Sequence, residues 1–525
     1  MQQSQGRLLG KVAFFLLAII FLSVAGAWAR PTTAEEAKNM VINWLGFEAQ
    51  PMDAAMSQQV KEVRSYPGPD GTTAYYVVFL QPRGLVIVPA DDLVEPIIGF
   101  LPDKMTYSPS KRNPLGALVS SDVTGRVVHA RGVEAASLES GQPLAAGDPL
   151  TQAQRKWAWL ANPVFSTEAL ESALPGISRV RVAPFVKSRW NQTTVGGAAC
   201  YNYYTPPYAA GDADNYPSGC VATAMAQLMR YFRWPLSGVG TGSYTIYIDG
   251  YADSTSLRGG NGAGGAYPWS SMPLVPSAPS TAERQAIGAL LHDAGAAVNM
   301  DYAAAGSGTD TLYAAAAFTG PFKYSNAKTA INSTATNLAA ANRDRMVNPN
   351  LHAKYPILFG ITGPAGGHAI VCDGYGYQTG AAYHHLNMGW AGYADAWYNL
   401  PTIDAGGYDF TSVYKCVYNV YKAGTGEIIA GQVTDSSGKG ISGATVKATR
   451  TSGAPFVRTG TTDNKGIYAL VKVPSATTFK VSVTKTGYTF TKKNTTTGTS
   501  VSGTWYSRND TCGNVLNLNF KAKAP

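Results

Sequence analysis

Glycine and proline occur at short intervals along this chain, and their frequency limits the length of the helices and strands that it can form. The 525 residues include 56 glycines, 31 prolines and 30 tyrosines. This composition favours short strands, turns and aromatic-rich loops over long charged helices, and it excludes a coiled coil. A hydrophobic fraction of 45% excludes a wholly disordered chain. The length is too great for one compact core and predicts about three or four domains.

The first 29 residues predict export. Arg7 and Lys11 form a positively charged start before the apolar stretch Val12–Val24. Ala27-Trp28-Ala29 then places small residues at the −3 and −1 positions of a signal-peptidase site. The alternative is an uncleaved membrane anchor. We expect cleavage near Ala29 and a secreted protein, extracellular or periplasmic.

Changes of pattern divide the rest of the chain into three parts. Residues 30–178 read as a small α+β unit followed by a connector that begins at residue 131. Residues 179–421 read as the largest domain, and residues 425–525 as an all-β sandwich. Helices are expected at Ala34–Leu45 and Thr151–Leu160, and early strands at Ala74–Leu80, Gly84–Val88 and Pro96–Gly99. Strict alternation predicts late strands at Ile428–Val433, Ala444–Thr449, Tyr468–Val471 and Thr478–Thr484.

A cysteine stands at the predicted start of a helix in the largest domain. Ser218 and Gly219 are suitable residues before a helix, and the apolar positions after Cys220 recur at helical spacing. In the first turn, unpaired backbone N–H groups and the helix dipole stabilise a thiolate. Cys220 is therefore a candidate nucleophile, the alternative being a buried structural cysteine.

A later hairpin supplies the partners that a cysteine nucleophile needs. Alternation places His368 and Cys372 on one face of a short strand opened by two glycines, and Asn387 lies near the end of the next strand. Imidazole and side-chain amide fit the roles of proton shuttle and ring orienter. Upstream, the side chain of Gln192 is a candidate donor to a developing oxyanion.

These segments, in this order, resemble the streptopain family of papain-like cysteine peptidases, which includes the interpain-type enzymes. The resemblance covers residues 180–421 and rests on Trp190-Asn191-Gln192, Gly219–Gln227, Tyr267–Met272, Val298–Tyr302, Gly366–Gly374 and Asn387–Trp390. It implies an α+β papain-like protease domain with Cys220 as nucleophile, His368 as general base and acid, Gln192 as oxyanion donor, Asn387 as orienter and Trp390 as aromatic cover. Gly84–Asp92 and Pro96–Gly99 resemble the family's inhibitory propeptide.

The sequence departs from the family pattern after Asn387. Met388 replaces a tryptophan and Ala391 replaces a glycine. The first change places the packing on the substrate side of the site in question, but not the proton chemistry. The five cysteines are an odd number, so at least one thiol is unpaired within the chain. Disulfides and separate buried thiols are both open for Cys200, Cys372, Cys416 and Cys512, with buried thiols favoured slightly.

The final hundred residues resemble the carboxypeptidase-regulatory-like, transthyretin-like β-sandwich, through Gly431–Asp435, Gly440–Val446, Thr461–Tyr468 and Lys485–Tyr488. From Gly424 onward there are 13 Lys and Arg against 4 Asp and Glu, which accounts for the net charge of +9. That charge favours an acidic glycan or the cell envelope as partner, or is a solvated face that aids solubility. No motif predicts a metal, a cofactor or a nucleic-acid partner.

The sequence thus predicts a secreted cysteine endopeptidase that acts on protein or peptide substrates and is made as a zymogen, with its own propeptide as intramolecular inhibitor. A cell-wall amidase on the same fold, or a catalytically decayed adhesin or inhibitor, are the alternatives. Maturation is expected by cleavage within residues 145–182, where Arg155, Lys156, Arg179 and Arg181 offer accessible basic sites.

Overall fold

The structure is a computed structural model that describes residues 30–110, 113–145, 147–161, 178–333, 335–363, 366–405 and 410–523. The predicted signal peptide, residues 1–29, lies outside the described residues. Residues 162–177 of the predicted connector also lie outside them. Within the described part of the chain, no helix combines the length and the apolar character needed to cross a membrane.

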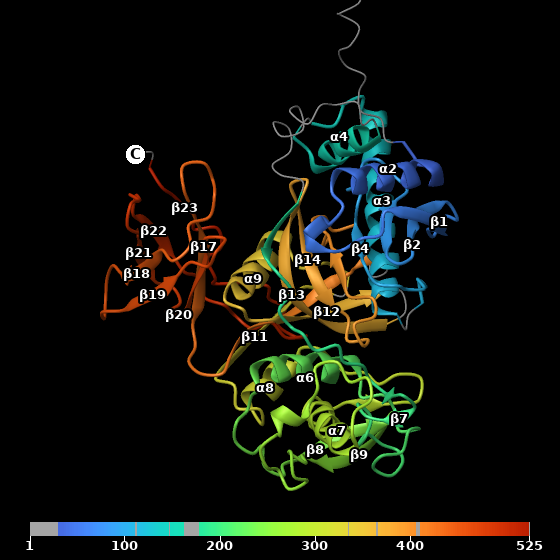
Figure 1. Ribbon diagram of the computed structural model, residues 1–525, viewed down its shortest axis with the longest axis vertical. Coiled ribbons are helices and arrows are strands. Elements are labelled where there is room, and N and C mark those ends of the chain that lie inside the picture. The colour runs from blue at the N-terminus through green and yellow to red at the C-terminus, as the bar shows by residue number, and fades with distance from the viewer. Residues whose placement is uncertain are drawn as a thin grey trace, which may run out of the picture.

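The N-terminal unit is a four-stranded antiparallel sheet between two helices (Figure 1). Its elements are α2 (Ala34–Phe47), β1 (Gln59–Pro67), β2 (Thr73–Gln81), β3 (Leu85–Pro89), β4 (Gly99–Leu101), α3 (Pro114–Ser140) and α4 (Pro149–Ala161). Alternate residues of β2 enter opposite cores: Tyr76 and Val78 pack with α2, whereas Val77 and Phe79 pack with α3. Both faces are covered, which explains why β2 is apolar almost throughout.

Helix α3 corrects the expectation of a connector beginning at residue 131. Asn113 caps its first turn by accepting hydrogen bonds from Leu115 and Gly116 N–H, and Pro114 fits the first helical position. Most residues from Leu115 to Val127 are buried, so no single apolar stripe marks this part of the helix. The predicted helices at 34–45 and 151–160 correspond to α2 and α4.

The sheet of the N-terminal unit continues into that of the central domain. Strand β4 pairs with β15 (Ala396–Tyr398), which pairs with β14 (Ala381–Asn387). The order then runs through β13 (Gly366–Gln378), β12 (Ile357–Gly363) and β16 (Val413–Tyr421) to β11 (Asn326–Ile331), with β5 (Ser178–Val182) also paired to β13. One apolar core joins α3 to this sheet, so the two units are packed as one body.

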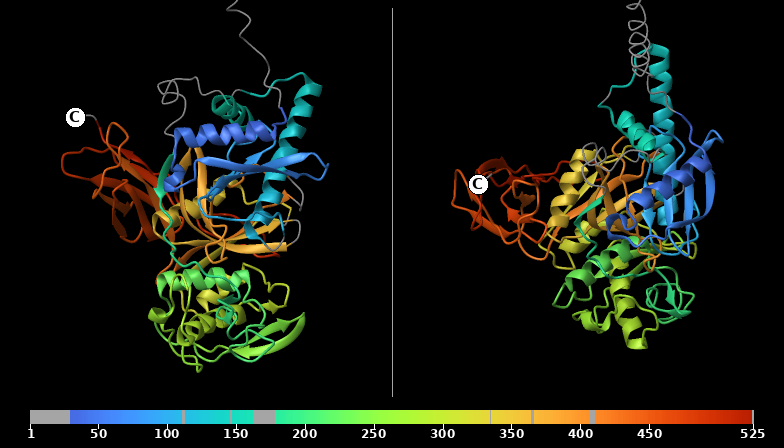
Figure 2. Two further views of the ribbon diagram at one scale, coloured as in Figure 1. Left: turned by 45° about the vertical axis from the view of Figure 1, so that its right-hand side comes forward. Right: turned by 45° about the horizontal axis from the view of Figure 1, so that its top comes forward.

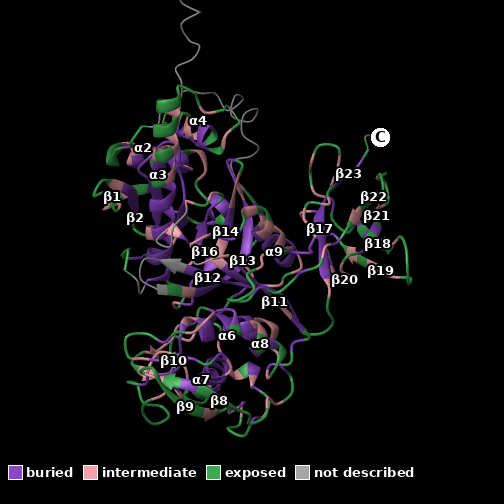
Figure 3. Ribbon diagram, turned by 180° about the vertical axis from the view of Figure 1, so that it is seen from behind, coloured by how far each residue is buried: buried purple, intermediate pink, exposed green. Residues whose placement is uncertain are grey.

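A largely helical subdomain covers one face of the central sheet. It contains α6 (Cys220–Phe232), α7 (Thr281–Ala296) and α8 (Tyr313–Thr319), together with the short strands β6 (Thr194–Val195), β7 (Ala198–Ala199), β8 (Ser243–Ile248), β9 (Tyr251–Ser256) and β10 (Asp301–Tyr302). Helix α6 packs against β13, and α9 (Ala340–His352) covers the opposite face (Figures 1 and 2). Figure 3 shows α6 and the central strands as mainly buried, and β9 as mainly exposed.

The C-terminal unit is a β-sandwich on the opposite side of the sheet domain from the N-terminal unit (Figure 2). One sheet is formed by β20 (Ile467–Val473), β17 (Glu427–Thr434) and β23 (Phe520–Lys521). The other is formed by β19 (Val457–Thr461), β18 (Thr445–Arg450), β21 (Thr478–Thr484) and β22 (Lys493–Thr496). The four late strands that alternation predicted are β17, β18, β20 and β21.

Candidate active site

Cys220 is the first residue of α6, and the residue before it is required to be glycine. Gly219 has φ of +86°, a conformation that side-chain-bearing residues rarely adopt. A Cβ on Gly219 would lie 2.7 Å from Met300 Sδ and 3.1 Å from the Ser307 carbonyl oxygen. The close packing around Gly219 therefore holds the helix start, and with it the thiol, in one place.

The surroundings of the thiol favour its ionised form. Burial of Cys220 opposes ionisation, but a hydrogen bond from His368, the charge of that ring and backbone N–H groups of Ala369 and Val221 outweigh it. The pKa of the Cys220 thiol therefore lies below its ordinary value. The Ala369 N–H is 3.3 Å from Sγ.

Strand β13 presents its residues alternately to the two faces of the sheet, as the sequence pattern indicated. Ala369 and Val371 belong to the core shared with α6, whereas Ile370 and Cys372 belong to the core on the opposite side. His368 lies near the start of β13 and is half-buried. Although alternation places His368 on the face of Ile370, its ring at this end of the strand forms a hydrogen bond with the thiol of Cys220, which lies about 150 positions earlier in the chain.

Gln192 is attached to the helix start through its backbone. Its carbonyl oxygen accepts a hydrogen bond of 2.9 Å from the N–H of Ser218, two residues before Cys220. The Gln192 side chain is half-buried. Its role as oxyanion donor remains a prediction.

Asn387 is buried and connects three segments of the site. Its Oδ1 accepts hydrogen bonds from Gln227 Nε2 at 2.9 Å and from Gly389 N–H at 3.0 Å. Its Nδ2 donates to the Ser188 carbonyl oxygen at 2.9 Å. These partners fix the segment before Gln192 against α6 and the end of β14. Orientation of His368 by Asn387 stays a prediction.

Gln227 is a site residue that the sequence analysis missed as a separate contributor. Its Oε1 accepts hydrogen bonds from Ser188 Oγ at 3.1 Å and Trp190 N–H at 3.4 Å, while its Nε2 donates to Asn387. The side chain is completely buried on α6, two turns after Cys220. A fully polar side chain within an apolar helix segment was the available signal, because buried amides need hydrogen-bond partners.

Trp390 is half-buried in the turn after β14. The next residue, Ala391, donates its N–H to the Trp190 carbonyl oxygen at 2.7 Å, which brings this turn to the segment that carries Gln192. Ala391 has φ of +57°, a conformation that favours the glycine of the family pattern.

Met388 has a different consequence from the one expected. Its side chain is completely buried in the core that the sheet shares with the N-terminal unit. The exchange of tryptophan for methionine at this position therefore changes core packing, and the expectation that it alters the substrate side of the site is wrong.

The other four cysteines are buried, Cys220 is partly buried, and none of the five forms a disulfide. Burial raises the pKa of the thiols of Cys200, Cys372, Cys416 and Cys512 above the ordinary value. This matches the preference for separate buried thiols over disulfides.

Each of the two histidine rings of β14 lies within hydrogen-bond distance of a polar side chain. His385 Nδ1 lies 2.6 Å from Asp373 Oδ1. His384 Nε2 lies 2.9 Å from Asn348 Oδ1, and burial lowers the pKa of His384 to about 3. Neither interaction involves the thiol, in accordance with a structural role for both rings.

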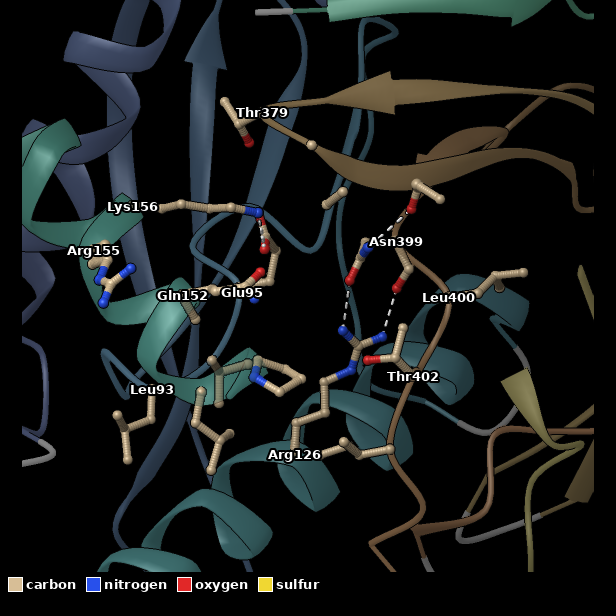
Figure 4. Close-up of a pocket in the computed structure, with 18 of the residues that line it drawn as sticks. Leu93, Glu95, Arg126, Gln152, Arg155, Lys156, Thr379, Asn399, Leu400 and Thr402 are labelled. Atoms are coloured by element: carbon tan, nitrogen blue, oxygen red, sulfur yellow. Dashed lines mark hydrogen bonds and ion pairs between the residues drawn. The ribbon is translucent and has the colours of Figure 1, made fainter. Parts of the chain in front are cut away.

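A large cavity in the described part of the chain lies away from the thiol. It has a volume of about 1050 Å³ and lies between the N-terminal unit, the β13–β14 turn and α9. Figure 4 shows the Lys156–Glu95 ion pair on one side and Arg126 bound to Asn399 on another. The cavity therefore marks the border between the N-terminal unit and the central domain, and we assign the chemistry to the Cys220–His368 pair.

Asp103 and Thr106 of the N-terminal unit contact two segments that flank the candidate site. Asp103 Oδ2 lies 3.9 Å from Arg189 Nη1, and the Thr106 N–H donates to the Tyr393 hydroxyl at 2.9 Å. Arg189 is three residues before Gln192, and Tyr393 is three residues after Trp390. The contacts place the N-terminal unit beside the segments that flank the candidate site.

Two of the four basic residues proposed as cleavage sites are bonded to partners. Lys156 is in α4 and pairs with Glu95 at 2.6 Å, with only 11% of its side chain exposed. Arg181 is in β5 and bonds to Gln432. Arg155 and Arg179 are exposed. The part of the predicted cleavage region at residues 162–177 lies outside the described residues.

Comparison with known proteins finds two families. Residues 190–398 match the Peptidase C10 family, and residues 428–504 match the carboxypeptidase regulatory-like domain. The chain is 25% identical over 400 residues to the thiol protease/hemagglutinin PrtT of Porphyromonas gingivalis, covering 75% of this chain and 42% of that protein. It is 27% identical over 189 residues to streptopain of Streptococcus pyogenes, covering 36% of this chain and 46% of that protein.

Solved structures similar to this one include a prointerpain A fragment of Prevotella intermedia. That fragment shares 25% identity, with a TM-score of 0.48, and the match covers 69% of this chain and 98% of the fragment. Active interpain A from the same organism shares 25% identity, with a TM-score of 0.37, over 48% of this chain and 97% of that chain.

The two predicted resemblances are confirmed by the family matches, as is an α+β protease-like region followed by an all-β sandwich. The chain spans less than half the length of the curated relatives that it matches.

Proposed function

We propose that this chain is a secreted cysteine endopeptidase, made as a zymogen, that hydrolyses peptide bonds in proteins. One observation carries the proposal: the Cys220 thiol, at a helix start, accepts hydrogen bonds from His368 and from backbone N–H groups that favour its thiolate. The match of residues 190–398 to a peptidase family supports the same chemistry.

The reaction proceeds in two acyl-transfer steps. The Cys220 thiolate attacks the scissile carbonyl carbon, and the resulting oxyanion is stabilised by the first-turn N–H of α6 and by the Gln192 side chain. Protonated His368 gives its proton to the leaving amine as the C–N bond breaks. His368 then takes a proton from water, which attacks the thioester carbon and releases the acid and the thiolate.

Asn387 and Trp390 complete the proposed site from the turn after β14. Asn387 orients the His368 ring, and Trp390 covers the pair from solvent. The hydrogen bonds of Asn387 to Gln227 and Ser188 support a fixed position for its amide, since an anchored amide orients a ring better than a mobile one.

The N-terminal unit acts as the inhibitory propeptide. Its contacts through Asp103 and Thr106 to the segments flanking the site support this role. Removal requires cleavage before Gln192, so that the oxyanion donor stays with the enzyme. Of the basic residues considered, Arg179 is exposed but lies in β5, and Arg155 is exposed on α4.

The C-terminal sandwich is a non-catalytic appendage. Its excess of positive charge favours association with acidic glycans or the cell envelope, whereas a solvated basic face is the simpler interpretation. Protein or peptide substrates are the partners of the catalytic site.

The test compares the processed wild-type protein with a Cys220→Ala variant. We expect the wild type to degrade casein and to bind an epoxide thiol inhibitor covalently, and the variant to do neither, with activity at least about a thousandfold lower. The variant should also accumulate at precursor size until a trace of active enzyme trims it.

Each alternative gives a different result in the same assay. Hydrolysis of peptidoglycan but not casein would identify a cell-wall amidase. No labelling of intact Cys220 would identify a decayed protein and end the enzyme assignment. A trimmed product that begins after Gln192 would exclude that residue from the oxyanion site.

A further inference from the structure

A loop of the C-terminal sandwich, Ser500–Gly513, lies against the outer edge of the central sheet. The Gly503 N–H donates to the Thr329 carbonyl oxygen at 3.0 Å, and Thr329 Oγ1 donates to the Gly503 carbonyl oxygen at 2.7 Å. The Ile331 N–H donates to the Asn509 carbonyl oxygen at 2.9 Å. Because β11 is the last strand of the sheet, this loop forms the outermost edge on that side.

Strand pairing connects this loop to the thiol in one row of residues. The row runs Ala369, Gly360, Lys415, Ile331 and Asn509, each paired with the next across neighbouring strands. Ala369 begins the row at the thiol, since its N–H donates to Cys220 Sγ. Neighbouring strands are about 4.8 Å apart, so Lys415 lies about 10 Å from Ala369 and the loop about 19 Å from it.

The row faces the same side of the sheet as Cys220. Ala369 packs in the core that contains α6. The neighbouring row is formed by Ile370, Phe359, Cys416 and Ala330, which all belong to the opposite core. Because side chains alternate along a strand, Lys415 projects from the thiol side of the sheet.

Lys415 links the loop to the helical subdomain. Its Nζ lies 2.6 Å from Asp310 Oδ1 and 4.3 Å from the centre of the Trp505 ring. Gly360 makes room for this arrangement, since a Cβ there would lie 2.8 Å from Lys415 Cβ. The buried ammonium group thus holds the Trp505 ring over the sheet by a cation–π contact.

Two aromatic side chains at the tip of the loop are open to solvent. Trp505 is 37% exposed and Tyr506 is 102% exposed. Large exposed aromatic side chains are suited to contact a polypeptide, because they offer apolar area at little entropic cost.

We propose that the loop around Trp505 and Tyr506 is part of the substrate-binding surface, and that it contacts an extended polypeptide about six residues from the scissile bond. An extended chain advances about 3.3 Å per residue, which spans the 19 Å row in about six residues. The inference rests on the proposed function and deepens it: the preferred substrates are long, unfolded segments, and the C-terminal sandwich contributes to their recognition.

The test measures kcat/KM of the processed full chain for two peptide series derived from one casein sequence. Peptides of the short series carry two residues on the side of the scissile bond that is varied, and peptides of the long series carry seven. Each side of the scissile bond is varied in a separate experiment. We expect the ratio of long-peptide to short-peptide kcat/KM to fall about tenfold in a Trp505→Ala/Tyr506→Ala variant, through KM, for extension on one side only.

A matched control lies on the same sandwich. Tyr488 is also exposed and pairs with Phe490, away from the row. Tyr488→Ala should leave the ratio unchanged. An unchanged ratio in the double variant, or an equal fall in Tyr488→Ala, would overturn the proposal.

A binding experiment separates this inference from the enzyme assignment. The same labelled peptides are bound to Cys220→Ala protein whose N-terminal unit has been removed by limited proteolysis, with and without the loop substitutions, and their Kd is measured by fluorescence anisotropy. Tighter binding of long peptides that is lost with the loop substitutions supports the surface, even if the wild type hydrolyses nothing. Equal Kd for long and short peptides overturns it, even if the wild type is an active peptidase.

Discussion

Cys220 and Cys372 are the same type of residue on opposite sides of the central sheet, and their thiols have opposite properties. Both thiols are near β13, and burial opposes ionisation of both. Cys220 receives hydrogen bonds from His368 and from backbone N–H groups, and its pKa is lowered. Cys372 has the Asp373 charge beside it, and its pKa is raised well above the ordinary value. Local donors, and not depth in the protein, therefore decide which cysteine is reactive.

The two cysteine regions should differ most in their effect on kcat, because we propose that only the Cys220 region stabilises the transition state. Gln192→Ala should lower kcat on a casein peptide by about a hundredfold, because one oxyanion donor is lost. The rate of alkylation of Cys220 by a small reagent should change little, since the thiolate itself remains. A variant with full kcat would exclude the proposed role of Gln192.

A substitution at His368 should make the pKa of the Cys220 thiol more like that of Cys372. Burial alone raises a thiol pKa, and the hydrogen bond and charge of His368 act against it, so His368→Ala should raise the pKa of Cys220. The alkylation rate rises with the thiolate fraction, and its pH midpoint should therefore move to higher pH in the variant.

This shift is measured by alkylation of the processed protein from pH 4 to pH 10, with the labelled cysteine identified by mass spectrometry. His384→Ala is the control, because His384 bonds to Asn348 and not to the thiol. A midpoint that is the same in wild type and His368→Ala would show that the ring does not act on the thiol.

The smallest effect concerns stability, and here the order of the two cysteines reverses. Cys372→Ser places a hydroxyl in an apolar core and should lower the free energy of unfolding by about 1–3 kcal/mol. Cys220→Ser should change it by less than about 0.5 kcal/mol, because N–H donors are already in place around that position. Thermal unfolding of the two precursors measures the difference.

The sequence indicated those features that depend on neighbouring residues. Gly219 before Cys220, the alternation of β13 and the polar turns of the C-terminal strands are local patterns, and each is present in the structure. The parts that were missed depend on distant segments. Helix α3 is buried on most sides over its first half, so its pattern contains no apolar stripe. Strand β15 has only three residues and is defined by its pairing with β14 and β4.

The site shows the same division. The types of Cys220 and His368 suggested their chemistry, but the buried contacts of Gln227 and Lys415 depend on residues 37 to 160 positions away. A polar residue in an apolar segment indicates that partners exist, without indicating which residues they are.

The pairing of β4 with β15 has a consequence for the rate of folding. Phe100 and Trp397, which are paired across this junction, are about 300 residues apart in the chain. Closing so long a loop is slow, because its entropic cost is met before the contact forms. The N-terminal strands are synthesised first and present a ready edge, on which β15 and then β14 can align. Synthesis of the central domain without residues 30–161 should therefore yield a chain that reaches the same sheet more slowly and aggregates more readily.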